Sequence, residues 1–236
     1  MSLYRVLRSA YCGVLPLTVR KWVHTTYPFS VFTEIVKAWL AKRANPEEVY
    51  DKEYFSEVVD PAASSAAPFV AGSIMRMFAP RMVIDVGCGS GAFLLEFKRL
   101  GASVLGLERA TAALEVLRSR GIDYLDLDLS KSAPAIPRAD LVISTEVAEH
   151  LPPESADKFV AFIASAAPLV VFTAATPGQG GTDHLNEQPA EYWVEKFGSL
   201  GFSLDEGRTR VMREEWTRPE VAVYYSKNLL IFRKGK

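Results

Sequence analysis

Residues 83–91 read Val83-Ile84-Asp85-Val86-Gly87-Cys88-Gly89-Ser90-Gly91. A short apolar run with β-branched residues meets an acid, turns through three glycines spaced two residues apart, and leads into an amphipathic segment. Glycine has no Cβ, so such a loop adopts positive φ angles without strain and lets a ligand approach the backbone closely. The stretch predicts a buried strand, a ligand-binding loop and a helix, in that order.

The rest of the chain repeats this alternation. After residue 78, short apolar runs alternate with longer amphipathic ones, which is typical of βα units around a mostly parallel sheet with helices on both faces. Residues 221–225 either extend the last strand or form part of a hairpin. We expect strands at 82–86, 103–107, 124–127, 141–144, 169–173, 202–204 and 228–232, and helices at 91–100, 110–120, 155–166 and 191–200.

The length of 236 residues suits one domain with an extension. Residues 61–68 are rich in Ala, Ser and Pro and mark a soft boundary. We therefore expect a helical, basic N-terminal arm or lid at 1–60 and the main domain at 61–236. Tyr50 and Tyr54 are candidates for covering a ligand, and equally for packing against the sheet.

Charge is distributed unevenly along the chain. The formal net charge is −1, which makes no general case for nucleic-acid binding, but residues 1–46 hold seven basic side chains against the single acid Glu34. Interspersed aromatic side chains fit contact with anionic lipid, although Pro16 and Pro28 interrupt a continuous amphipathic helix. We favour a structural or lid role for this arm, with peripheral membrane contact through residues 1–46 as the alternative.

Cysteine usage and hydropathy indicate the compartment. Cys12 and Cys88 are the only cysteines, which excludes a disulfide framework, a zinc-ligand spacing and the three-cysteine cluster of a radical iron–sulfur enzyme. No apolar run reaches the ~18 residues of a spanning helix, and the N-terminal apolar stretch lacks a persuasive cleavage site. We expect a cytoplasmic protein, with association at the membrane surface as the open alternative.

Asp85 sets the charge of the predicted ligand loop. The G-x-G-x-G spacing, with an acid two residues before the first glycine, differs from the G-x-G-x-x-G pattern of dinucleotide-binding loops. A pyrophosphate would be repelled by Asp85, whereas the ammonium and sulfonium groups of S-adenosylmethionine are cationic and favoured there. We therefore expect S-adenosylmethionine as the cofactor, with a dinucleotide-dependent dehydrogenase as the minor alternative.

Two further acids follow predicted strands. Glu108 ends the second strand, where a carboxylate can accept hydrogen bonds from both ribose hydroxyls, and Arg109 comes directly after it. Asp128 follows the third strand and could accept from an adenine amine, with the backbone N–H of Leu129 beside it. Asp126 is the competing candidate for that role.

These motifs resemble those of class I S-adenosylmethionine-dependent methyltransferases in order and spacing. The resemblance covers about residues 50–205 and implies a Rossmann-like, seven-stranded sheet with an antiparallel last strand, and S-adenosylhomocysteine as the product. The matching segments are Val83 to Ala92, Glu108, Asp126 to Leu129, and Ala139 to Leu151.

The resemblance also implies roles for individual residues. Residues Asp85 to Gly91 hold the methionine part of the cofactor, Glu108 its ribose and Asp128 its adenine. Glu146 and Val147 approach the methyl group. Methyl transfer is an in-line displacement, so the protein mainly aligns the reacting atoms and needs a base only where the nucleophile must lose a proton.

The loop after the fifth predicted strand is long, glycine-rich and polar. His184 in this loop is the candidate general base for an acceptor hydroxyl, with Asp183 or Glu187 orienting it. Alternatively, the loop only braces the following helix, or Asp183, His184 and Glu187 bind a metal. No diagnostic ligand spacing is present, so we expect no metal. For His150 we favour a packing role, and His24 has no recognisable partner.

These residues predict an enzyme that methylates a hydroxyl of a small molecule or glycan. The competing functions are a nucleic-acid methyltransferase that uses the basic arm, and a non-catalytic module that binds S-adenosylmethionine. The chain lacks an aromatic-flanked Asn-Pro-Pro type of signature for a base amine, and every predicted cofactor position is filled. Both observations favour the small-molecule enzyme.

Overall fold

The computed structural model describes residues 52, 55, 59–128, 135–181 and 183–235. At its centre lies a seven-stranded sheet with the order β3-β2-β1-β4-β5-β7-β6. The neighbouring pairs among β1 to β5 are parallel, and β7 runs antiparallel to both β5 and β6. The strands are β1 (Met82–Val86), β2 (Ser103–Glu108), β3 (Tyr124–Asp126), β4 (Leu141–Thr145), β5 (Leu169–Thr173), β6 (Phe202–Leu204) and β7 (Leu230–Lys234).

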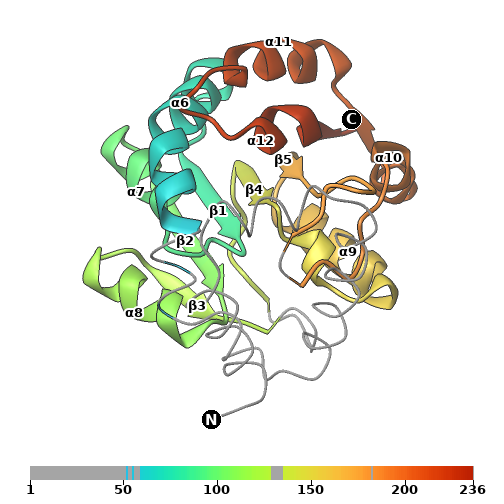
Figure 1. Cartoon of the computed structure of the whole chain (residues 1–236). Helices are drawn as coiled ribbons and strands as arrows, with labels where there is room; N and C mark the ends of the chain where they lie inside the picture. The colour runs from blue at the N-terminus through green and yellow to red at the C-terminus, as the bar shows by residue number, and fades with distance from the viewer. Residues whose placement is uncertain (1–51, 53–54, 56–58, 129–134, 182, 236) are drawn as a thin grey trace, which may run out of the picture.

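Helices cover both faces of the sheet (Figure 1). One hydrophobic core lies beneath α6 (Asp60–Phe78), α7 (Ala92–Arg99), α8 (Thr111–Ser119), α11 (Glu206–Trp216) and α12 (Val223–Asn228). The other lies beneath α9 (Ala156–Ala166) and α10 (Ala190–Ser199). The Rossmann-like fold and the antiparallel last strand predicted from the sequence are therefore confirmed.

Burial on both faces explains why the strands were recognisable. In β1, Val83 contributes to the first core, whereas Ile84 and Val86 contribute to the second. Strands covered on both faces have near-continuous apolar sequences, and β-branched residues suit this environment. Buried apolar side chains at successive positions thus placed the central strands within a residue or two of their observed bounds.

The prediction for residues 221–225 was wrong. Instead of a strand or hairpin, Val223–Asn228 form the helix α12, and β7 begins at Leu230. Tyr225 is 7% exposed and its ring meets that of Phe93 edge to face at 5.7 Å, whereas Val223 is 74% exposed. A run of β-branched and aromatic residues resembles a strand locally, but packing of Tyr225 against α7 determines the observed conformation.

Two helices were not anticipated from the sequence. Residues 61–68, interpreted as a breaker-rich boundary, belong to α6, in which Pro61 occupies the first turn and Pro68 lies inside the helix. Alanine is the strongest helix former, and the alanines of α6 pack in the first core. Polar α11 escaped notice because few of its residues are buried. The predicted arm at 1–60, with Tyr50 and Tyr54, lies almost wholly outside the described residues.

No helix in the part of the chain that the structure describes combines the length and apolar character needed to cross a bilayer.

Gly91→Ala is expected to destabilise the protein by about 2 kcal/mol or more, from left-handed strain and overpacking together. Gly91 has φ 75°, and a Cβ there would lie 2.4 Å from Leu117 and 2.7 Å from Ile122. Gly121→Ala is the matched control, because Gly121 has φ 62° and no atom within 4 Å of the added Cβ. Urea unfolding measures both. Equal losses of stability in the two variants would contradict the packing argument.

Candidate functional site

The glycine loop lies at the carboxyl end of β1. Gly87, Gly89 and Gly91 all have positive φ, at 75°, 52° and 75°. The backbone N–H groups of Gly87 and Cys88 donate to the carbonyl oxygen of Leu107 at 2.8 and 3.2 Å, which fixes the loop to the end of β2. A Cβ at Gly87 would lie 2.5 Å from a methyl carbon of Val147, so this loop and the segment after β4 touch.

Asp85 is buried beside this loop, with 2% of its surface exposed. Its Oδ1 has no hydrogen-bond partner among the described residues. Burial, with a smaller contribution from the negative charge of Glu108, raises the pKa of Asp85 to about 8. A buried carboxyl group with an unused oxygen costs free energy unless a donor or cation reaches it, so the position suits a cationic ligand.

Glu108 joins β2 to the glycine loop. Its Oε2 accepts from the N–H of Gly89 at 2.8 Å. Its Oε1 accepts from the N–H groups of Arg109 and Ala110 at 2.8 and 3.0 Å. The carboxylate is therefore held at the loop, and a ribose hydroxyl would share or replace one of these bonds. The ribose role of Glu108 stays a prediction.

The two candidates for the adenine end differ in exposure. Asp126 ends β3 and is exposed, whereas Asp128 is partly buried. Asp128 Oδ1 lies 3.4 Å from Nη1 of Arg109, so Arg109 and Asp128 stand together beside the end of β2. This geometry favours Asp128 over Asp126. Leu129 lies outside the described residues.

An anchor missed from the sequence holds the glycine loop from the other side. The Ser90 hydroxyl donates to the carboxylate of Asp60 at 2.5 Å, and Arg120 lies 3.1 Å from the same carboxylate. Arg120 also donates to the carbonyl oxygen of Ser90 at 2.9 Å. Burial by itself would raise the pKa of Asp60, but these Ser90 and Arg120 contacts outweigh it and lower that pKa. No sequence pattern links these three positions.

Asp60→Asn is expected to weaken S-adenosylhomocysteine binding by less than about tenfold, since hydrogen bonds to a charged group contribute about 1.5–3 kcal/mol and partial exposure reduces this. The amide can still accept from Ser90 but loses the ion pair with Arg120. Isothermal titration calorimetry measures the change. Glu115→Gln, which removes an exposed partner of Lys52, is the control and should leave the affinity unchanged. An unchanged Kd in the Asp60 variant would show that the anchor does not support the loop.

Glu146 follows β4, has a strained backbone conformation, and has hydrogen bonds to its N–H and to both carboxylate oxygens. Its φ is 54°, and its N–H lies 3.0 Å from both oxygens of Thr173. Its carboxylate accepts from the side-chain amides of Gln179 at 2.7 Å and Asn228 at 3.1 Å. Asn228 also donates to Gln179 at 2.8 Å, closing a triangle. Gln179 and Asn228 were not expected from the sequence, because they come from separate segments.

The ring of His184 contacts Glu187. Nδ1 of His184 lies 2.8 Å from Oε1 of Glu187, and the same carboxylate accepts from the N–H groups of Gly178 and Gly180 at 2.8 Å each. Glu187 thus both folds the loop and orients the ring. Asp183 and Glu187 were both candidates for orienting His184, and this geometry supports Glu187.

His150 lies beside His184. The two rings meet edge to face at 5.0 Å, and Nδ1 of His150 is 3.3 Å from the backbone carbonyl oxygen of Asp183. Burial, together with the neighbouring His184, lowers the pKa of His150 to about 4. The sequence favoured a packing role for His150 and did not predict its contact with His184. This contact joins the loops after β4 and β5.

Glu149 completes this cluster. Its side chain is fully buried, and no donor in the described part of the chain lies in hydrogen-bond geometry to either carboxylate oxygen. Burial raises the pKa of Glu149 well above its usual range, and the nearby Glu146 raises it further. Its backbone carbonyl accepts from the N–H groups of Leu185 and Asn186 at 2.7 and 2.9 Å. The loops after β4 and β5 are therefore fastened together at Glu149.

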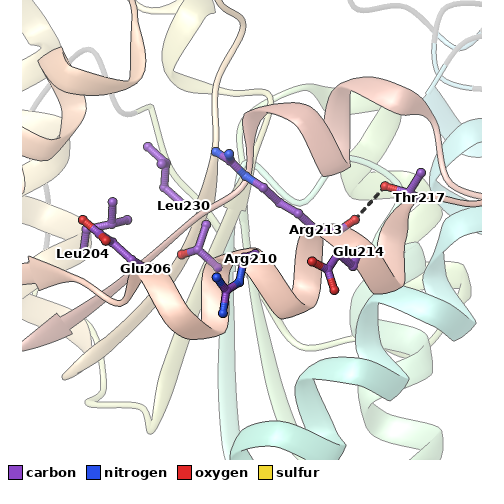
Figure 2. Close-up of a pocket in the computed structure, with 8 residues that line it drawn as sticks. Leu204, Glu206, Arg210, Arg213, Glu214, Thr217 and Leu230 are labelled. Carbon is purple, nitrogen blue, oxygen red and sulfur yellow. Dashed lines mark hydrogen bonds between the residues drawn. The ribbon is translucent and has the colours of Figure 1, made fainter.

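A surface depression of about 300 Å³ lies elsewhere, along α11 and the adjoining ends of β6 and β7 (Figure 2). Its lining includes the charged side chains of Glu206, Arg210 and Glu214. Arg213, also in its lining, donates to the carbonyl oxygen of Leu229 at 2.8 and 3.0 Å. The depression shares no residue with the edge that carries the glycine loop, so we place the site at that edge.

The segment that contains the glycine loop resembles known proteins. Residues 83–167 match the family model described as a methyltransferase domain. A ubiquinone biosynthesis O-methyltransferase from Alkalilimnicola ehrlichii is 31% identical over 120 residues, which are 48% of this chain and 44% of that protein. The chain thus spans less than half the length of that relative.

Solved structures share the fold at low sequence identity. Magnesium protoporphyrin IX methyltransferase from Synechocystis PCC 6803, solved with SAH bound, has a TM-score of 0.56 at 18% identity and covers 74% of this chain and 84% of its own. The sugar N-methyltransferase KedS8 from Streptoalloteichus sp. ATCC 53650 has a TM-score of 0.57 at 15% identity and covers 79% and 93%. The segment 83–167 therefore matches a methyltransferase domain, and it lies in a chain whose strand order is that of a Rossmann-like methyltransferase fold.

Proposed function

We propose that the chain binds S-adenosylmethionine at the glycine loop and transfers its methyl group to a hydroxyl of a small molecule or glycan. The observation that carries this proposal is Asp85, a buried carboxyl group with an unused oxygen beside three glycines of positive φ. The bound cofactor supplies a methyl group on a positively charged sulfur. A cationic ligand is what this carboxyl group lacks.

The other predicted cofactor residues fit the same ligand. Glu108 is held at the loop and offers carboxylate oxygens to ribose, which donates from its hydroxyls. Asp128, with Arg109 beside it, offers an acceptor for the amino group of adenine. Val147 touches the loop at Gly87, and Glu146 is held rigidly next to it. These two residues line the boundary between the cofactor and the acceptor.

The proposal of an oxygen acceptor draws on one relative and on His184. The relative from Alkalilimnicola ehrlichii is named an O-methyltransferase, whereas KedS8 is named a sugar N-methyltransferase and shares only the fold. Within this chain, His184 is the residue that we assign to activating the hydroxyl. Glu187 holds its Nδ1, so Nε2 is the ring nitrogen that would take the proton of an acceptor.

Two measurements test the proposal in sequence. Isothermal titration calorimetry with S-adenosylhomocysteine and, separately, with NADH tests the cofactor; saturable NADH binding alone would overturn it. A screen of hydroxyl- and amine-bearing metabolites with methyl-labelled S-adenosylmethionine then tests the acceptor. Label transfer to oxygen is expected. Cofactor binding with label found only on nitrogen would reject the hydroxyl and retain the methyltransferase.

A further inference from the structure

Glu149, His150 and His184 form a cluster that the cofactor site does not use. One ligand atom from each residue lies within 4.8 Å of the others, although Glu149 and His184 are far apart in sequence. Glu149 is fully buried with both carboxylate oxygens lacking a hydrogen-bond donor among the described residues. A buried carboxyl group in this state is costly for the fold, and a bound cation would compensate it.

The orientation of both histidines favours a ligand at their Nε2 atoms. Nδ1 of His184 faces the carboxylate of Glu187, and Nδ1 of His150 faces the carbonyl oxygen of Asp183. Both oxygens can only accept, so each Nδ1 carries a proton and each Nε2 can present its lone pair. Histidines that bind metals are commonly held by a carboxylate or a backbone carbonyl on the opposite nitrogen in this way.

The loop backbone passes close to the same place. A Cβ at Gly181 would clash with Nε2 of His184, so a glycine at this position lets the loop pack beside that edge of the ring. The hydrogen bonds from Leu185 and Asn186 to the carbonyl of Glu149 fix the two loops relative to each other. The ligand atoms are thus placed by backbone contacts, which a preformed metal site requires.

We propose that Glu149, His150 and His184 bind a divalent transition-metal ion beside the cofactor site. Two imidazole nitrogens and one carboxylate are a ligand set used for Zn²⁺ in hydrolytic enzymes and for Fe²⁺ in oxygenases, with positions left open for substrate. The mixed nitrogen and oxygen donors suit Zn²⁺, Mn²⁺, Co²⁺ or Fe²⁺ better than Mg²⁺ or Ca²⁺, which prefer oxygen alone.

The role of this ion rests on the proposed function. An acceptor hydroxyl that coordinates a divalent ion loses its proton more readily. The O–H bond breaks and the proton passes to water; the oxygen then bonds to the methyl carbon while the carbon–sulfur bond breaks and its electron pair stays on sulfur. His184 would then assist the loss of this proton by holding the ion.

Metal binding is tested on the full chain without cofactor or acceptor. After dialysis against Mn²⁺ or Zn²⁺ and removal of free ion, elemental analysis is expected to find one ion per chain in the wild type and none in Glu149→Gln. Glu154→Gln, an exposed acid a few residues away, is the matched control and should keep the ion. Glu187→Gln is expected to weaken the affinity by about 10- to 100-fold, as for other groups that orient a ligand. No bound ion in the wild type, or equal binding in Glu149→Gln, would overturn the proposal.

Folding of the variant and the identity of the ligands are checked separately. Glu149→Gln replaces a buried carboxyl group by an amide of the same shape, so it is expected to fold and to show no change of melting temperature with Mn²⁺, whereas the wild type is stabilised. Pulsed electron paramagnetic resonance of bound Mn²⁺ is expected to show coupling to two nitrogen ligands; absence of nitrogen coupling would reject the site.

Cofactor binding distinguishes failure of the metal site from failure of the proposed function. S-adenosylhomocysteine titration is independent of the cluster, so it should give the same Kd in wild type and Glu149→Gln. Label transfer by a metal-free wild-type protein at an undiminished rate would reject the catalytic role of the ion while leaving methyl transfer intact.

Discussion

Asp85→Asn is expected to weaken S-adenosylhomocysteine binding by about 10- to 100-fold, because a hydrogen bond to a charged group contributes about 1.5–3 kcal/mol. The same variant is expected to be more stable than the wild type. Asp85 is buried, its Oδ1 lacks a donor among the described residues, and its pKa is raised to about 8. Asparagine keeps the shape of the side chain and removes the group whose ionisation is penalised.

The gain in stability depends on pH in a defined direction. The pKa of Asp85 is about 8 in the folded protein against 3.8 as its ordinary value, so between these values the folded state binds more protons than the unfolded state. The stability contributed by protonated Asp85 is full below pH 4 and is lost as the pH rises through about 8. The advantage of Asp85→Asn should therefore grow from pH 5 to pH 8.

Thermal unfolding and calorimetry at pH 5, 6.5 and 8 measure both effects. Asp157→Asn, an exposed acid paired with Lys196, is the control and should change neither affinity nor the pH trend. A stability gain that is equal at all three pH values would show that Asp85 is not protonated in the folded protein. Unchanged affinity would remove Asp85 from the cofactor site.

Cofactor affinity in the wild type should depend on pH for the same reason. A cationic ligand favours ionised Asp85, so binding near neutral pH must release a proton from this group. Affinity is then expected to rise by up to about tenfold per pH unit until the pH approaches 8. Titrations in buffers of different ionisation enthalpy measure the released proton directly, and a heat that is independent of the buffer would contradict this coupling.

His184→Ala is expected to lower the turnover number by about 10²- to 10⁴-fold, the range found for groups that assist proton transfer. The Kd for S-adenosylhomocysteine should stay within a factor of about two, since His184 lies in the loop after β5 and not in the glycine loop. Glu187→Gln keeps the imidazole of His184 but weakens the contact that orients it, so a smaller loss of turnover is expected. Steady-state kinetics on the acceptor found by label transfer measures both.

The pattern across the two variants decides the role of His184. A loss of cofactor affinity as large as the loss of turnover would show that the alanine disturbs the fold of the loop. Unchanged turnover would assign His184 a bracing role only. Glu191→Gln, an exposed acid at the start of the following helix, is the matched control and should retain the activity of the wild type.

Local sequence patterns were sufficient to predict the central strands and the glycine loop. Strands buried on both faces have continuous apolar sequences, and the loop needs glycine at positions of positive φ. Candidates such as Glu108 and Asp128 followed from the same logic, because the carboxyl ends of parallel strands meet at one edge. The helix α12 was missed because the strand propensity of residues 221–225 is overridden by the contact of Tyr225 with Phe93.

Sequence patterns were enough to predict the class of fold, the edge of the sheet at which the candidate site lies, and a cationic ligand at Asp85. Each depends on residues that are neighbours in sequence or that end parallel strands. The contact between Glu187 and His184, and the cluster that Glu149 and His150 form with His184, became visible in the folded chain alone. These groups come from two loops, and their relative position is set by β4 pairing with β5 and by the hydrogen bonds to the carbonyl of Glu149.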